Sequence, residues 1–355
     1  MKILIDSLSK RMTVPLIREL KNNNYQVHGI CKKTEKNLSR NKVDKVFFVD
    51  YKKNPKKQLE KIFSNYSSHD ILIFGNPVNI KILDLIKPDI NYLSPSQILV
   101  KRVTNKSNLN IIAKSLGIKV PKESNEKYPM IIKLKNSENT SLKPNERYRI
   151  IRNKEDFHQS QNFINKNNKN LIFQEYVEGE SFGVSMLMDH KSNMLDYIVH
   201  KRILEYPISG GPSSLCSTVE NHLLVESTKK LLEHIKWKGF AMVEYKGDYL
   251  IEINPRFWGS MPLIFKSKSS FFKNYINYLL NEPLINQDKI PYKLNVKMNY
   301  FPQGLISIFS LLKNKYWSKS FKGFMGILGS REGIFSLKDP KPFILYLLGL
   351  FRRNL

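Results

Sequence analysis

The sequence predicts a mixed fold, α/β over its N-terminal part and α+β beyond it. Two patterns carry this prediction. Short apolar runs alternate with helical apolar periods over roughly the first ninety residues, which is typical of a parallel sheet with helices on both faces. Farther along, a helical segment is followed by strand-like runs that end in a hairpin. The chain has 355 residues, 41% of them hydrophobic, which is enough for two or three packed units.

The first unit is expected to be a Rossmann-like domain over residues 1–97. Its strands are predicted at residues 2–5, 26–31, 45–49 and 71–74, with apolar helical faces at 16–20 and 59–63 between them. The loop after the first strand, Asp6-Ser7-Leu8-Ser9, lacks the GxGxxG pattern. The sequence therefore does not support a dinucleotide site in this domain.

Two α+β units are expected next, a smaller one over residues 98–176 and a larger one over residues 177–290. Helices are predicted at 104–116 and 221–235, and strands at 130–134, 171–177, 181–188, 195–202, 239–245 and 249–254. The last two strands form a hairpin around Lys246-Gly247-Asp248. Residues 291–355 are expected to form a basic helical tail.

The charge is strongly positive, with 58 Lys and Arg against 31 Asp and Glu, a formal net charge of +27. Such an excess favours an anionic partner, for which a substrate, a membrane surface and nucleic acid stay open. The alternative is a general basic bias of the sequence with no such partner. No recognition motif supports specific nucleic-acid binding. The longest apolar stretch, residues 343–351, is shorter than the ~20 residues that span a bilayer. We expect a soluble, cytoplasmic protein in which residues 343–353 either pack on the body or contact a membrane surface.

The chain has two cysteines, Cys31 and Cys216, and neither lies in a CxxC pattern. This number is too low for a disulfide framework and fits a reducing compartment. Cys216 is either a nucleophile or a small buried apolar side chain.

The hairpin carries the most informative polar residues. With a three-residue loop at 246–248, Glu244 pairs opposite Leu250, and Glu252 is its diagonal neighbour on the same face. Asn254 lies two residues farther along and joins that face. Two neighbouring carboxylates repel unless one is protonated or a cation lies between them, and these oxygen donors suit Mg²⁺. The alternative is an exposed hairpin with an acidic outer face.

Residues 249–260, Tyr-Leu-Ile-Glu-Ile-Asn-Pro-Arg-Phe-Trp-Gly-Ser, resemble the metal-binding signature of ATP-grasp ligases. They are most similar to a branch of uncharacterised carboxylate–amine ligases related to the carbamoyl-phosphate synthase large chain. Further matches follow the family's order over about residues 1–280, and a late match lies at 335–343. The ordered matches are Lys106, the strand at 128–133, the segment 174–180, and the segments 200–202, 205–207 and 210–213.

The resemblance implies an ATP-grasp fold, with a pre-ATP-grasp domain followed by two lobes that clasp ATP. It implies Mg²⁺, or Mn²⁺ in its place, bound by Glu244, Glu252 and Asn254. It assigns the nucleotide to Lys106, Lys133, Gln174, Glu175, Tyr176, Val177 and Glu180. It assigns catalytic roles to Arg256, Lys201 and Arg202, of which Arg256 stabilises an acyl phosphate. Gly210 and Gly211 form either a loop near the acceptor or a plain turn.

Two positions depart from the family pattern. Residues 134–147, where ATP-grasp enzymes carry a glycine-rich phosphate loop, contain no glycine, so Ser137, Thr140 and Ser141 would have to donate instead. The carboxylate expected at the ribose falls at Ser181, next to Glu180.

The activity implied is ADP-forming ligation of a small-molecule carboxylate to an amine through an acyl phosphate. A different nucleophile, a non-catalytic nucleotide-binding homologue and a basic nucleic-acid- or membrane-binding protein are the alternatives. A homodimer is left open.

Overall fold

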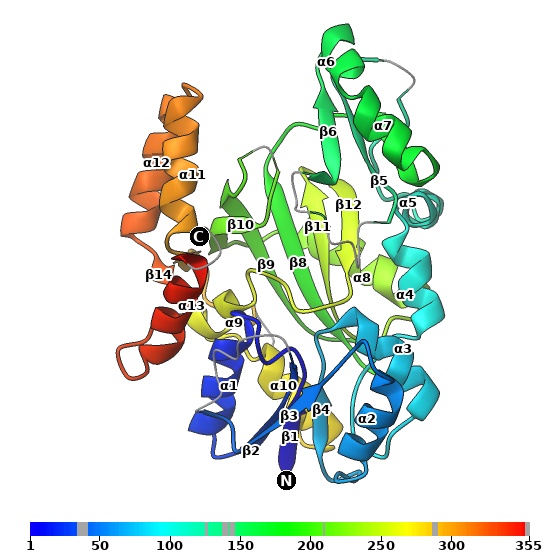
Figure 1. The fold of residues 1–355 in the computed structure, drawn as a ribbon, viewed down its shortest axis with the longest axis vertical. Coiled ribbons are helices and arrows are strands. Elements are labelled where there is room, and N and C mark those ends of the chain that lie inside the picture. Colours follow the sequence, from blue (N-terminus) through cyan, green and yellow to red (C-terminus); the bar gives the residue numbers. More distant parts are fainter. Residues whose placement is uncertain are drawn as a thin grey trace.

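The computed structural model of the chain describes residues 1–33, 42–124, 127–136, 142, 146–208, 210–285 and 290–351. Three sheets organise the described residues, and Figure 1 shows them from one end of the molecule to the other. A four-stranded sheet lies at the N-terminal end, a seven-stranded sheet in the middle and a three-stranded sheet at the far end. The predicted combination of α/β and α+β parts is confirmed.

The N-terminal sheet is parallel, in the order β3-β2-β1-β4, as the alternating pattern predicted. Its elements are β1 (Lys2–Ile5), α1 (Thr13–Asn22), β2 (Gln26–Lys32), β3 (Lys45–Val49), α2 (Pro55–Phe63), β4 (Ile71–Ile73) and α3 (Pro77–Ile86). Asp6, just after β1, is buried and accepts hydrogen bonds from Gly75 N at 2.5 Å and Asn79 Nδ2 at 2.7 Å. The first loop therefore ties β1 to the start of α3.

The three-stranded sheet has the order β6-β5-β7 and forms the small lobe. Its elements are α4 (Gln97–Thr104), α5 (Lys106–Ser115), β5 (Met130–Leu134), β6 (Tyr148–Ile151), α6 (Lys154–Gln159), α7 (Gln161–Asn167), η3 (Asn168–Asn170) and β7 (Leu171–Glu175). The predicted start of the helix at 104–116 is wrong, because the helical conformation is interrupted at Asn105, between α4 and α5. The Asn105 side chain accepts from the backbone N–H of Ser107 at 3.0 Å and so caps α5.

The seven-stranded sheet has the order β12-β11-β8-β9-β10-β13-β14 and forms the large lobe. Its elements are β8 (Ser181–Met188), β9 (Met194–Glu205), β10 (Ser213–Thr218), α8 (His222–His234), β11 (Gly239–Lys246), β12 (Tyr249–Asn254), α9 (Pro262–Lys266), α10 (Phe271–Leu279), β13 (Lys297–Asn299), α11 (Gln303–Lys313), α12 (Trp317–Leu328), β14 (Arg331–Glu332) and α13 (Lys341–Phe351). The C-terminal segment was predicted to be helical, and its described residues form α11, α12 and α13. It also adds β13 and β14 to the sheet, which the prediction of a helical tail missed.

Helix α13 contains most of the segment for which a membrane contact was considered. Its Phe343 and Tyr346 pack against a buried cluster that includes Val14 and Tyr300. Arg18 forms an ion pair with Asp339 at 3.0 Å just before the helix. The segment thus packs on the body of the protein along this face, while residues 352 and 353 lie outside the described range. None of the helices in the described part of the chain has the length and apolar character that crossing a bilayer requires.

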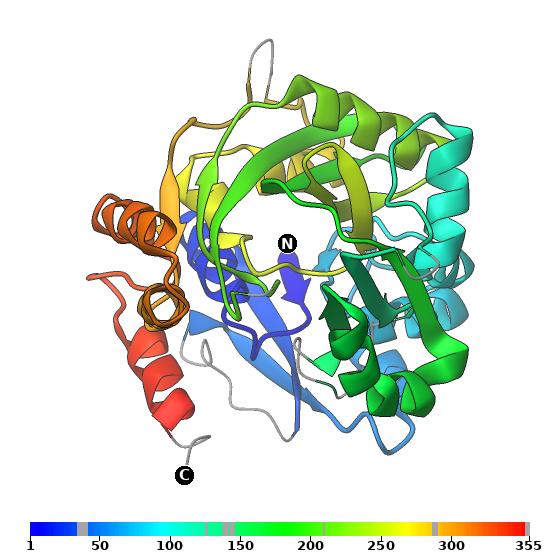
Figure 2. The ribbon, with the colours of Figure 1, turned by 90° about the horizontal axis from the view of Figure 1, so that it is seen from above.

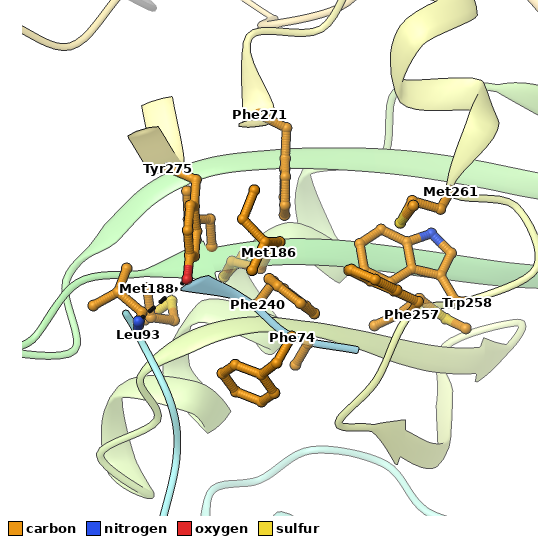
Figure 3. Packing of buried hydrophobic residues seen from close by; sticks show 14 of the residues in the cluster. Phe74, Leu93, Met186, Met188, Phe240, Phe257, Trp258, Met261, Phe271 and Tyr275 are labelled. Carbon is orange, nitrogen blue, oxygen red and sulfur yellow. Dashed lines mark hydrogen bonds between the residues drawn. The ribbon is translucent and has the colours of Figure 1, made fainter. Parts of the chain in front are cut away.

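The N-terminal domain and the large lobe share one hydrophobic core, part of which is drawn in Figure 3. Phe240 of β11 stacks on Phe257, with ring centroids 5.4 Å apart. The Tyr275 hydroxyl of α10 donates to Leu72 O at 2.8 Å and accepts from Leu93 N at 3.3 Å. These contacts fix the large sheet, and with it the hairpin of interest, on the N-terminal domain.

Gly75 allows the closest approach in this interface. A Cβ atom at this position would lie 2.0 Å from the Phe257 ring, and Phe257 N donates to Gly75 O at 3.3 Å. Phe257 follows Arg256 directly, so the N-terminal domain supports the end of the hairpin.

We expect Gly75→Ala to lower the free energy of unfolding by about 1–3 kcal/mol, because the methyl group has to displace a stacked ring in a packed core. Gly349→Ala is the matched control. That glycine lies in α13 with no atom within 4 Å of the added Cβ, so the change should be neutral or slightly stabilising. Chemical denaturation of both variants measures the difference, and equal stabilities would contradict the packing described.

Candidate functional site

The β11–β12 hairpin places Glu244 and Glu252 directly opposite each other. Lys246 pairs with Tyr249 across a two-residue turn, and Tyr245 pairs with Leu250. The register then shifts, so that Ile251 is an extra, bulged residue. The predicted register, with Glu244 opposite Leu250, is therefore wrong. A bulge depends on the hydrogen bonding between two strands, which the pattern of apolar residues in one strand does not report. Its effect is to bring the two carboxylates closer together than a regular hairpin would.

Asn254 lies on the same face and joins the two carboxylates. Its Nδ2 donates to Glu244 Oε1 at 3.0 Å and lies 3.4 Å from Glu252 Oε1. Its Oδ1 is buried and has no hydrogen-bond partner among the described residues. A buried amide oxygen beside two carboxylates is costly unless a donor or a cation is supplied to it.

Each carboxylate has its own cation. Arg202 Nη2 lies 2.5 Å from Glu244 Oε1, and Lys106 Nζ lies 3.2 Å from Glu252 Oε2. Burial raises the pKa of Glu244, against the opposing effect of Arg202. Burial acts in the same direction on Glu252, but Lys106 and then Arg256 outweigh it and lower the pKa of Glu252 to about 2. Glu252 thus keeps its negative charge through the cations around it.

Lys133 of β5 extends this cationic group from the small lobe. Its side chain is buried near Lys106, and burial followed by the Lys106 charge lowers the pKa of Lys133 to about 7. An ammonium group held in this way gains stability from any anion that enters beside it.

These groups line a cavity of about 550 Å³ between the small lobe and the large lobe. Figure 2 shows the three-stranded and the seven-stranded sheet on opposite sides of the molecule's centre in the view from above. The lining contains seven cationic side chains, Arg11, Lys106, Lys133, Arg147, Arg202, Lys246 and Arg256. It contains four carboxylates, Glu175, Glu205, Glu244 and Glu252. The surplus of three positive charges suits an anionic ligand.

The cavity also has an apolar part. Pro121, Ile131 and Leu134 line it from the small lobe, and the bulged Ile251 lines it from the hairpin. The segment from Glu175 to Val177, which leaves β7, completes this wall. An apolar wall next to a cationic region suits a nucleotide, which joins an apolar base to anionic phosphates.

Not every predicted residue reaches the cavity. Gln174 is buried on the other side of β7, where its Nε2 donates to Pro121 O at 3.1 Å. Lys201 pairs with Glu180, and neither side chain lines the cavity. Arg202 does line the cavity, because successive residues of a strand face opposite sides of the sheet. Asn254 lies behind the two carboxylates instead of at the surface of the cavity.

Several lining residues were not predicted from the sequence, among them Tyr148, Arg11 and Glu205. Tyr148 of β6 donates from its hydroxyl to Gly210 O at 3.0 Å and so connects the two lobes above the cavity. Arg11 of the N-terminal domain lines the cavity from below, with its guanidinium 3.6 Å from the centre of the Tyr300 ring. Glu205, within the family-like segment 205–207, lies 3.7 Å from Arg202 Nη1. For the part of the lining that comes from the N-terminal domain, the sequence offers no signal beyond an arginine, Arg11, shortly after the first strand.

Cys216 is buried in β10, and burial raises the pKa of its thiol to about 12. A thiol of this kind stays protonated, so the nucleophile interpretation is not favoured. The glycine-free loop is described only at residues 134–136, 142 and 146–147, and Ser137, Thr140 and Ser141 lie outside the described residues.

We expect Arg202→Met to lower the free energy of unfolding by about 3–5 kcal/mol at neutral pH, because Glu244 is left buried without its cation. The loss should shrink at acid pH, where Glu244 takes up a proton. Lys201→Met is the control, since an exposed pair with Glu180 contributes about 1 kcal/mol or less. Urea titrations across pH measure both, and an equal loss in the two variants would contradict the arrangement.

Comparison with known proteins agrees with this geometry. Residues 103–260 match the sequence profile of the ATP-grasp domain. No curated protein sequence matches the chain. Biotin carboxylase from Campylobacter jejuni has a TM-score of 0.62 at 14% identity, covering 83% of this chain and 74% of its own.

Two further solved structures are similar. N5-carboxyaminoimidazole synthetase from Staphylococcus aureus, complexed with ADP, has a TM-score of 0.63 at 12% identity, covering 90% of this chain and 96% of its own. L-amino acid ligase from Bacillus licheniformis has a TM-score of 0.58 at 13% identity, covering 78% and 74%. At these identities the likeness concerns the fold. The chain therefore contains an ATP-grasp domain over residues 103–260 and shares the fold of these proteins.

Proposed function

We propose that this protein is an ATP-dependent ligase that joins a small-molecule carboxylate to an amine through an acyl phosphate. The observation that carries the proposal is the pair Glu244 and Glu252, held opposite each other and surrounded by Lys106, Lys133 and Arg256 in one cavity. Structures of similar fold have been solved with ADP and with the magnesium salt of ADP. Another structure of similar fold is that of an L-amino acid ligase.

The donor set fits Mg²⁺. Glu244, Glu252 and Asn254 offer hard oxygen atoms, and the buried Asn254 Oδ1 atom has no hydrogen-bond partner among the described residues. The described residues contain no group of three His, Cys, Asp or Glu side chains suited to a metal ion. Phosphate oxygens and water would therefore complete the coordination, as is usual for Mg²⁺ with nucleotides. When bound, the ion supplies neutralisation and polarisation of phosphate oxygens.

Different residues of the chain then bind the base, the phosphates and the transferred phosphoryl group. Ile131, Leu134 and the segment from Glu175 to Val177 hold the base against an apolar wall. Lys106 and Lys133 bind the phosphates at the cationic end. Arg256, beside the carboxylate pair, stabilises charge on the phosphoryl group in transit.

The reaction balances without a covalent enzyme intermediate. The γ-phosphoryl group leaves ADP and forms a bond with a carboxylate oxygen of the substrate. The amine nitrogen attacks the acyl carbon, phosphate leaves, and the amine loses a proton. The protein needs only to position the reactants and to offset their charge.

Glu252→Gln should lower Mg²⁺-dependent ADP release by about two to three orders of magnitude, because the site loses charge where the phosphates and metal meet. Purified protein is assayed for ADP release against pooled carboxylates and amines. Asp248→Asn is the control, since Asp248 lies in the hairpin turn and pairs with Lys119 at 2.6 Å, away from the cavity. Full turnover in Glu252→Gln would contradict the metal assignment. ADP binding with no release for any pool would support the non-catalytic alternative.

Binding of ADP should take up protons above pH 7. In the ligand-free protein the pKa of Lys133 is about 7, so at pH 8 the amine is mostly neutral, and phosphate raises its pKa on binding. We expect uptake of roughly 0.9 proton at pH 8 and a loss of affinity as pH rises further. Calorimetry in buffers of different ionisation enthalpy measures the uptake. Lys133→Arg, which stays protonated, should abolish it. Unchanged uptake in that variant would rule out Lys133 as the source.

A further inference from the structure

A large apolar surface lies on the C-terminal helical hairpin, α11 and α12, at the edge of the large lobe (Figure 1). On α12 the exposed apolar side chains recur at helical spacing along one face. They are Trp317, Phe321, Phe324, Met325 and Leu328, joined by Ile306 and Phe309 of α11 and by Tyr316 in the turn. Monomeric proteins rarely expose so many large apolar side chains together, and such patches usually mark an interaction surface.

The orientation of α12 is set by its opposite face. Ser320, Gly323 and Gly326 are buried at spacings of three residues. A Cβ atom would lie 2.9 Å from the Leu204 side chain at Gly323 and 2.7 Å from the Leu215 side chain at Gly326. The small side packs against β9 and β10, so the aromatic side faces outward as a direct consequence of the sequence.

The charges of this surface are all of one sign. No Asp or Glu occurs from residue 289 to residue 331. Four lysines, Lys313, Lys315, Lys319 and Lys322, are exposed on the same hairpin. An apolar face bordered by lysines, with Tyr316 and Trp317 at the turn, is the pattern of helices that lie in the boundary between lipid headgroups and acyl chains.

We propose that the α11–α12 hairpin docks the protein on an anionic lipid bilayer. A second copy of the chain would bring four lysines against four lysines, which opposes self-association through this face. Nucleic acid would satisfy the lysines but leave the apolar side chains in water. An anionic bilayer accommodates both. None of the residues of this surface lines the cavity, so the proposal goes beyond the ligase function and does not depend on it.

The protein carries its own probe for this contact. Of its three tryptophans, Trp237 and Trp258 are 0% and 1% exposed, whereas Trp317 is 65% exposed. Titration with phosphatidylcholine–phosphatidylglycerol vesicles should shift the emission to shorter wavelength and protect it from acrylamide. Vesicles of phosphatidylcholine alone should do neither. Trp317→Phe should abolish the shift and keep the binding measured by vesicle flotation. A shift that persists in Trp317→Phe would overturn the assignment of the contact to this hairpin.

Flotation with the same vesicles separates the apolar and charged contributions. Phe321→Ser combined with Leu328→Ser, and Lys319→Glu combined with Lys322→Glu, should each weaken vesicle binding by about tenfold or more. All four side chains are exposed, so folding should be unaffected. One matched control is Ile111→Ser with Leu223→Ser, and the other is Lys52→Glu with Lys53→Glu. These residues are exposed on other elements, so both control variants should bind vesicles as the natural chain does.

Three results would overturn the proposal. One is equal binding to neutral and anionic vesicles, or none to either. Another is a dimer in sedimentation equilibrium that Phe321→Ser with Leu328→Ser dissociates, because the face would then serve a second copy. The third is binding of a generic RNA that needs the hairpin lysines, in the absence of vesicle binding.

Discussion

The structure depends on one electrostatic constraint, the placement of Glu244 and Glu252 directly opposite each other in a half-buried hairpin. Two carboxylates in this position repel unless cations surround them. The cations come from separate parts of the chain, Lys106 from α5, Arg202 from β9 and Arg256 from the segment after β12. Lys133, from β5, adds a fourth charge from the small lobe. Both lobes are thus held to the hairpin by the same pair of acids, and the cavity lies where they meet.

The packing below the hairpin preserves this geometry. Phe257, next to Arg256, lies on Gly75 of the N-terminal domain and stacks on Phe240 of β11. The Tyr275 hydroxyl joins α10 to two backbone positions of that domain. The end of the hairpin is therefore fixed by a shared core, to which α4 and α5 of the small lobe also contribute, whereas the three-stranded sheet has a hydrophobic cluster of its own. The carboxylates thus lie on a hairpin built into the shared core, and Lys133 lies on the sheet with the separate cluster.

Much of this organisation was predictable because apolar periodicity reports strands and helices directly. The parallel N-terminal sheet, the hairpin and the acids on one face of it follow from that pattern. The bulge at Ile251, the break at Asn105 and the addition of β13 to the large sheet do not, because each depends on partners distant in the sequence. The resemblance named Lys201 with Arg202, yet only the strand geometry tells which of the two faces the cavity. Arg11 reaches the cavity from a domain with no motif of its own.

The central claim is that the acidic pair and Asn254 hold one divalent cation together with the phosphates of a nucleotide. Electron paramagnetic resonance of Mn²⁺ tests it most directly, because free and bound Mn²⁺ give distinct signals. We predict one tightly bound Mn²⁺ per chain when ADP is present and much weaker binding without ADP. The Glu244→Gln chain should lose the ADP-dependent site. Mn²⁺ binding that is indifferent to ADP, or that survives in Glu244→Gln, would contradict the account.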